Sequence, residues 1–149
     1  MHHRNLRDAL RGQARLIEKY PAEVLAVGKY FILPRQKSAA AFDAALTARG
    51  AQLSAKDRAR LMALVGPLDQ TLLLEAGLPE RPWYKSLLYA PGRFTGYGTK
   101  TMPGIREGIE DEHFDDASKF IGLTAAALKA YAAKLDQATQ MLSGPPAIN

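Results

Sequence analysis

The feature that most constrains the fold of this chain is the spacing of side chains near its C-terminus, over residues 121–142. Apolar or small residues recur there at alternating steps of three and four, which places them on one face of an α-helix. The positions are Ile121, Thr124, Leu128, Tyr131, Leu135, Ala138 and Leu142. Further alanines at 125, 126, 132 and 133 suit close packing on a second face. The sequence therefore predicts a long helix that packs against other helices.

Capping and stop signals delimit this helix and predict three others. Asp115 or Asp116 is expected to cap the final helix, because a carboxylate suits the positive end of the helix dipole. The sequence SGPP after residue 142 ends it. Ser38 and Ser54 are the expected N-caps of two earlier helices, and Pro67 is expected to kink the later of them. The three earlier helices are predicted over residues 4–20, 38–49 and 54–76.

No segment of useful length shows the alternation that is typical of a β-strand. The sequence therefore predicts an all-α fold, an up-and-down bundle of about four main helices with one long crossover loop over residues 77–114. A length of 149 residues favours a single domain. A crossover this long is uncommon in a compact domain and is usually functional.

Composition excludes several classes of protein. No apolar run approaches the roughly 20 residues of a membrane-spanning helix, and no apolar block follows the basic start MHHRNLRDALRG as it would in a signal peptide. Cysteine is absent, which excludes disulfides and thiol chemistry. The net charge of +5 arises in residues 1–75, where the first arginines lie at helical spacing, as on a solvated helix face. We therefore expect no nucleic-acid partner.

No motif for catalysis or metal binding is evident. His113 stands in the acidic run EDEHFDD, but no second His or Cys lies at ligand spacing, so a solvated turn before a helix is the favoured interpretation. His2 and His3 lie at the start of the chain. The segment GYGTKTMPG lacks the Gly-Lys-Ser/Thr order of a phosphate-binding loop. We expect this chain to hold no catalytic residue, no metal and no cofactor.

The crossover has the composition of a binding surface. Arg93, Phe94, Tyr97 and Lys100 are interleaved with glycines, so the backbone can approach a ligand closely while rings and cations face it. Cations beside a tyrosine hydroxyl suit a carboxylate ligand. The alternative is that Tyr97 only packs the loop down. A neighbouring group is expected to close one end of the bundle: Trp83, Tyr84, Leu87, Leu88 and Tyr89.

The same region resembles a known family. GLPERPWYKSLLYAP at residues 77–91, followed by Tyr97 and by PGI at 103–105, is similar to the C-terminal dimerisation domain shared by transferrin receptor and glutamate carboxypeptidase II. The spacing from Pro91 to Tyr97 to Pro103 needs no gap, and the flanking helices fit in order and length. The resemblance implies that residues 1–149 are one helical dimerisation domain in the C-terminal part of a larger peptidase-like protein.

The resemblance also implies roles for single residues. In the carboxypeptidases the loop, here residues 91–104, reaches the active site, where a Lys-Tyr pair helps to hold the carboxylates of the released glutamate. The tyrosine falls on Tyr97, but the lysine falls on Gly96, so Arg93 or Lys100 is the candidate source of charge. Zinc is expected in the parent's peptidase domain. The implied partners are a second copy of the chain, that peptidase domain and a peptide substrate.

The candidates for the dimer interface are Tyr84, Tyr89, Tyr131 and Leu135. Two alternative functions stay open. One is a free-standing helical module that binds another protein, and the other is the dimerisation domain of a receptor-like relative without peptidase activity. The compartment is also open: a secreted or periplasmic parent is compatible with the sequence, and no signal in this chain decides it.

Overall fold

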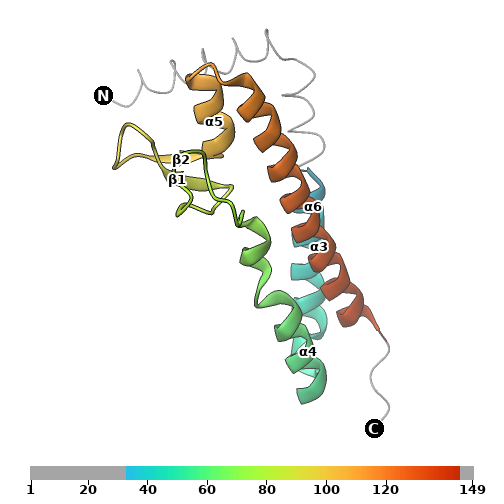
Figure 1. The fold of residues 1–149 in the computed structure, drawn as a ribbon. Helices are drawn as coiled ribbons and strands as arrows, with labels where there is room; N and C mark the ends of the chain where they lie inside the picture. The colour runs from blue at the N-terminus through green and yellow to red at the C-terminus, as the bar shows by residue number, and fades with distance from the viewer. Residues whose placement is uncertain (1–32, 145–149) are drawn as a thin grey trace, which may run out of the picture.

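The computed structural model describes residues 33–144, whose arrangement is shown in Figure 1. Within that range the chain is mostly helical, with four α-helices and one two-stranded sheet. The two longest helices, α3 (Leu33–Arg49) and α6 (Phe114–Ser143), lie side by side, and α4 (Ala55–Val65) packs near the C-terminal end of α6. This confirms the expected all-α bundle. The helix predicted over residues 4–20 lies outside the described residues.

The start of α3 differs from the prediction. The helix begins at Leu33, so Ser38 is not its N-cap; Ser38 lies inside the helix with its side chain buried. Pro34 occupies the first turn, which tolerates proline because the N–H groups there have no partner within the helix. The predicted end at Arg49 is confirmed, and Gly50 opens a 3₁₀ turn, Gly50–Gln52.

The start of α4 agrees with the prediction, whereas its end does not. Ser54 Oγ accepts a hydrogen bond from the Asp57 N–H at 3.1 Å and donates one to Asp57 Oδ2 at 2.7 Å. The helix stops at Val65 instead of kinking at Pro67 and continuing to residue 76. Pro67 lacks the N–H that a further turn needs, and its ring crowds the preceding turn. The chain therefore continues as a 3₁₀ turn, Leu68–Leu72.

The crossover is folded rather than open. It contains an antiparallel hairpin of β1 (Tyr89–Pro91) and β2 (Thr99–Thr101), followed by α5 (Pro103–Glu110). This small sheet is compatible with the expected all-α fold, and its three-residue strands are too short to show an alternating pattern in the sequence. Figure 1 shows the hairpin projecting sideways next to α5, near the N-terminal end of α6.

The start of α6 also differs in detail from the prediction. The helix begins at Phe114 with His113 as its N-cap residue, so Asp115 and Asp116 are not caps. Both lie in the first turn, where their negative charge still suits the helix dipole. The predicted end near residue 142 is confirmed, because the helix runs to Ser143.

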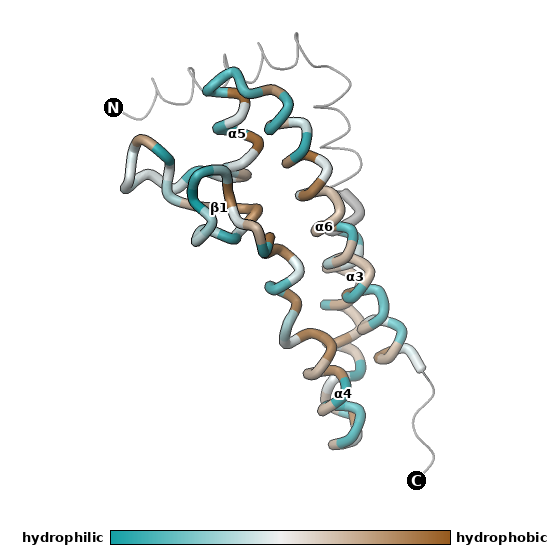
Figure 2. Tube along the Cα trace, viewed as in Figure 1, coloured by the Kyte–Doolittle hydropathy of each residue, from teal (hydrophilic) through white to brown (hydrophobic). Residues whose placement is uncertain are grey.

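The core follows α6 along its length. Most of the predicted face is buried: Thr124, Leu128, Leu135, Ala138 and Leu142. Two clusters of buried residues pack within residues 33–144, one joining Phe120 to the crossover and one joining Leu142 to α4. Figure 2 shows hydrophobic residues along the segment that connects α4 to β1, while the turn between α5 and α6 is hydrophilic. None of the helices described is long and apolar enough to cross a membrane.

The apolar group that was expected to close one end of the bundle does so in part. Leu87 is buried, and Tyr84 and Leu88 are half-buried. Trp83 and Tyr89 are mostly exposed, so the expectation that they close one end of the bundle is wrong for these two rings. The crossover therefore has an inner side that packs on α6 and an outer side that carries exposed aromatic residues.

Candidate functional site

The β1–β2 hairpin carries the residues that the family resemblance marks as functional. Its tip, residues 92–98, is closed by a hydrogen bond from the Gly92 N–H to the Gly98 carbonyl oxygen at 2.9 Å. Gly96 has a φ of +61°, in the left-handed region that glycine adopts readily. A lysine at this position would pay about 1–2 kcal/mol for the same backbone conformation. The glycine thus suits the turn that immediately precedes Tyr97.

The aromatic side chains of the hairpin lie at its surface. Tyr97 is fully exposed, and Phe94 and Tyr89 are mostly exposed. The alternative in which Tyr97 packs the loop down is therefore wrong for this chain. Large apolar side chains grouped on a projecting hairpin are typical of a binding surface.

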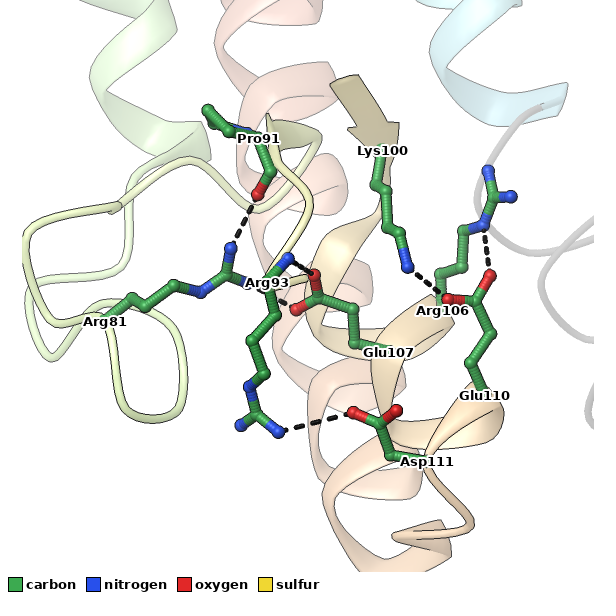
Figure 3. A network of polar contacts seen from close by, with 8 residues as sticks. All are labelled: Arg81, Pro91, Arg93, Lys100, Arg106, Glu107, Glu110 and Asp111. Atoms are coloured by element: carbon green, nitrogen blue, oxygen red, sulfur yellow. Dashed lines mark hydrogen bonds and ion pairs between the residues drawn. The ribbon is translucent and has the colours of Figure 1, made fainter. Parts of the chain in front are cut away.

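The two candidate cations point toward acidic residues on or next to α5 (Figure 3). The guanidinium of Arg93 forms ion pairs with Glu80 at 3.2 Å and with Asp111 at 3.3 Å, and its side chain is only 15% exposed. The Lys100 ammonium is paired with Glu110, and its side chain is 16% exposed. In this conformation both charges are neutralised within the domain.

A buried ion pair that the sequence analysis missed joins the start of the crossover to α5. Arg81 and Glu107 are each 7% exposed, and Arg81 Nη2 donates a hydrogen bond to Glu107 Oε2. Arg81 Nη1 also donates to the Pro91 carbonyl oxygen at 2.6 Å, and the guanidinium lies 5.6 Å from the centroid of the Tyr84 ring. The second carboxylate oxygen, Glu107 Oε1, accepts the Arg93 N–H at 2.8 Å. Glu107 thus contacts the hairpin directly and through Arg81 (Figure 3).

Close packing fixes α5 on α6. A Cβ atom on Gly104 would overlap the Phe120 ring, and one on Gly108 would come within 2.8 Å of the Ala117 backbone nitrogen. Residues 104, 107 and 108 share one helix face by their spacing. In the sequence, a glutamate with a glycine on either side on the same helix face is the pattern that could have indicated a buried Glu107.

Glu110 links β2 to α5 on the other side of the hairpin. It accepts hydrogen bonds from Lys100 Nζ and from Arg106 Nε, the latter at 2.8 Å. Burial raises the pKa of Glu110, but hydrogen bonds and positive charge from Lys100 and Arg106 outweigh burial, so the pKa lies below its ordinary value of 4.5. The carboxylate is therefore ionised at neutral pH and holds Lys100 beside α5.

Comparison with known proteins identifies the family to which this fold and hairpin belong. The transferrin receptor-like dimerisation domain family matches residues 36–136, a range that includes the hairpin, α5 and most of α6. The chain belongs to this family. The resemblance based on the crossover motif is thereby confirmed.

Curated relatives match shorter parts of this transferrin receptor-like domain. A probable glutamate carboxypeptidase of Arabidopsis thaliana is 49% identical over 43 residues, which are 29% of this chain and 6% of that protein. A probable glutamate carboxypeptidase of Arthroderma benhamiae is 33% identical over 64 residues, 43% of this chain and 9% of that protein. Vacuolar protein sorting-associated protein 70 of Saccharomyces cerevisiae is 39% identical over 44 residues, 30% of this chain and 5% of that protein. The matched segments thus span less than a tenth of each relative.

The predicted interface residues of this dimerisation domain lie in different settings. Tyr89 is mostly exposed on β1, whereas Tyr84 and Tyr131 are half-buried. Leu135 is only 4% exposed, so its side chain packs within the chain and offers little surface to a second subunit. The part that each of these residues plays in a dimer stays a prediction.

The described part of the domain offers no site for the zinc ion of the family's peptidases. Over residues 33–144 no three His, Asp or Glu side chains are grouped so that they could hold a metal ion. His113 lies exposed at the start of α6, beside the acidic residues of the α5–α6 turn. These residues do not fit a zinc centre.

Proposed function

We propose that this chain is the dimerisation domain of a glutamate carboxypeptidase-like peptidase and that residues 91–104 help to form the substrate pocket of the parent protein. The observation that carries the proposal is Tyr97, which matches the substrate-contacting tyrosine of the resembling carboxypeptidases and is fully exposed at the hairpin tip. The two relatives named as probable glutamate carboxypeptidases support the same parent activity. The catalytic residues and the zinc would belong to the parent's peptidase domain.

Tyr97 offers two kinds of contact to a peptide substrate. Its hydroxyl can donate a hydrogen bond to the terminal carboxylate, and its ring can pack against an apolar side chain. Gly96 stands where the family has a lysine, and both Arg93 and Lys100 are paired with acidic residues near or on α5. A missing charge-assisted hydrogen bond is worth about 1.5–3 kcal/mol, or roughly ten- to hundredfold in affinity. We therefore expect no strong preference for a C-terminal glutamate.

The test is the kcat/KM of the full-length parent for peptides that end in Glu, Leu or Phe. We expect values within about tenfold of one another. A strong preference for Glu would show that Arg93 or Lys100 leaves its acidic partner and replaces the lysine. Tyr97→Phe keeps the ring and removes only the hydroxyl, so it should lower kcat/KM by roughly tenfold through the lost hydrogen bond. An unchanged kcat/KM would show that the hydroxyl takes no part in substrate binding; an unchanged kcat/KM in Tyr97→Ala as well would remove Tyr97 from the site.

The homodimer is the second part of the proposal. Tyr89 and Trp83 expose large rings on the outer side of the crossover, and membership of a dimerisation domain family supports a second copy of the chain as the partner of this surface. Stable interfaces bury on the order of 1,600 Å² in total. Sedimentation equilibrium of the 149-residue chain at high concentration should therefore detect a dimer, and Tyr89→Ser should weaken it. A strictly monomeric chain would restrict the dimer to the full-length parent.

A dimerisation domain without peptidase activity is the second candidate function. One relative, the yeast vacuolar protein sorting-associated protein 70, is named for sorting rather than for hydrolysis. The same assay separates the two candidates, because a receptor-like parent would hydrolyse none of the three peptides. The free-standing interaction module is tested by the reading frame upstream of this sequence, which should encode a peptidase-like domain if the proposal is right.

A further inference from the structure

Glu107 is a buried acidic residue whose contacts lie on both sides of Gly92, the first residue of the hairpin tip. Its Oε1 accepts the backbone N–H of Arg93 at 2.8 Å, immediately after Gly92. Its Oε2 accepts a hydrogen bond from Arg81, which in turn donates to the carbonyl oxygen of Pro91 at 2.6 Å, immediately before Gly92. One carboxylate therefore fixes the backbone at the point where β1 passes into the tip.

The backbone that carries Glu107 is itself held in place. Gly104 and Gly108, on the same face of α5, leave no room for a Cβ atom against Phe120 and Ala117 of α6. Any movement of the Glu107 backbone would have to move α5 relative to α6. A continuous set of contacts thus runs from the core helix through α5 and Glu107 to the hairpin tip (Figure 3).

We propose that Glu107 is a positioning residue, which sets the direction in which the hairpin presents Tyr97 without touching the substrate itself. Hydrogen bonds between a charged group and its partners are stronger than neutral ones, and in a buried site they are exposed to little competition from water. The effect on substrate binding rests on the proposed function, whereas the effect on the hairpin does not.

The ion pairs of the Arg93 and Lys100 side chains are less suited than Glu107 to fixing the direction of the hairpin. Arg93 reaches Glu80, which is mostly exposed, and Asp111, which is 24% exposed, in both cases through its side chain alone. Lys100 reaches Glu110, which is 40% exposed. Ion pairs of exposed groups contribute little to a defined geometry. Glu107, in contrast, holds Arg93 by its backbone N–H, and that contact survives any change of the side chain at position 93.

Amide hydrogen exchange of the 149-residue chain, followed by NMR, tests the structural part. Glu107→Gln should accelerate exchange at residue 93, and with it at Gly96 in the tip, by on the order of ten- to hundredfold. Amides of α6, such as that of Leu128, should change much less. Arg93→Ala should leave the amide at position 93 protected, because the donor is the backbone. Glu75→Gln, which removes one partner of an exposed ion pair with Lys85, is the matched control and should change nothing in the hairpin.

Two results would overturn the inference. One is an unchanged hairpin in Glu107→Gln. The other is equal acceleration in the hairpin and in α6, which would make Glu107 a contributor to overall stability only. If Glu107→Gln does not fold, Arg81→Lys serves instead, because a single ammonium lacks the planar fork that reaches both Glu107 and the Pro91 carbonyl. It should accelerate exchange in the hairpin and spare α6, and a hairpin that stays protected would overturn the inference.

Kinetics of the full-length parent separate this inference from the proposed function. Glu107→Gln and Tyr97→Ala should both raise KM for a peptide by roughly tenfold, with a smaller change in kcat. A raised KM in Tyr97→Ala together with a normal KM in Glu107→Gln would overturn the positioning role. Normal KM values in both variants, with fast exchange at residue 93 in Glu107→Gln, would overturn the proposed function and leave the structural role of Glu107 standing.

Discussion

The helix α6 and the hairpin with α5 are held in place by different forces. Along α6, apolar side chains at alternating steps of three and four are buried, and the crossover, α3 and α4 pack against them. The hairpin has few such contacts at its tip, where the large rings are exposed. It is fixed instead at its base by Glu107 on α5, to which Glu110 adds a partly exposed ion pair with Lys100.

The stability of the domain and the orientation of the hairpin tip therefore depend on different contacts. Apolar burial is not directional and grows with area, so it suits a helix that must support a whole domain. Hydrogen bonds to a buried carboxylate are directional, so they suit a short segment that must point one way. The tip can then leave its own aromatic residues unburied, because its position does not depend on burying them.

Leu128→Ala should give the largest effect among substitutions in either region. Leu128 is 2% exposed on the central face of α6, so the cavity and the lost burial should lower the free energy of unfolding by roughly 2–5 kcal/mol. Urea denaturation followed by circular dichroism measures the change, with exposed Lys129→Ala as the neighbouring control. A loss below about 0.5 kcal/mol, the range of ordinary surface substitutions, would show that α6 does not carry the core.

The packing of α5 on α6 is tested by replacing a glycine with alanine at each of two positions, 104 in α5 and 122 in α6. Gly104→Ala should lower the free energy of unfolding by about 1–3 kcal/mol, because the added methyl group overlaps the Phe120 ring. Gly122→Ala should raise it by about 0.5–1 kcal/mol, because Gly122 is exposed within α6 and a Cβ there meets no atom within 4 Å. A Gly104→Ala variant that is as stable as the unmodified chain, or more stable, would contradict the close packing of α5 on α6.

The smallest expected effect is a pH dependence at Glu110. Its pKa is lowered in the folded chain, so its contribution to stability is present above the unfolded value near 4.5 and is lost as the pH falls through the folded pKa. An NMR titration of the Glu110 carboxyl carbon should give a midpoint below 4.5, and Lys100→Met should move the midpoint upward. A midpoint that does not respond to Lys100→Met would mean that Lys100 is not held by Glu110.

The sequence predicted the parts of the fold that depend on repeated apolar spacing. The buried face of α6 and the capping pair of Ser54 and Asp57 were visible because each follows a short-range rule. Ser38 failed as a cap because Pro34 lies in the first turn of the helix, and a proline there resembles a helix break when only the sequence is read. The hairpin and α5 were missed because their elements are too short for a pattern to repeat.

The candidate site was predictable to a similar extent. Tyr97 was singled out through the family motif; the structure shows that its side chain is exposed, and its contact with substrate stays a prediction. The pairing of Arg93 and Lys100 was not visible, because Asp111 and Glu110 become their neighbours only once α5 packs beside the hairpin. Glu107 was missed for the same reason: an isolated charged residue carries no periodic signal, and its burial depends on the two glycines that flank it on one helix face.

The most direct test of the central claim is to measure Tyr97→Ala in two ways, by the unfolding free energy of the 149-residue chain and by kcat/KM of the full-length parent. We expect a change in unfolding free energy within about 0.5 kcal/mol, because the Tyr97 side chain is fully exposed and buries nothing. We also expect kcat/KM for peptide hydrolysis to fall by roughly tenfold or more, because the substrate loses both a hydrogen bond and a ring contact. A clear loss of stability with unchanged kcat/KM would contradict the proposed pocket, since Tyr97 would then support the fold and take no part in substrate binding.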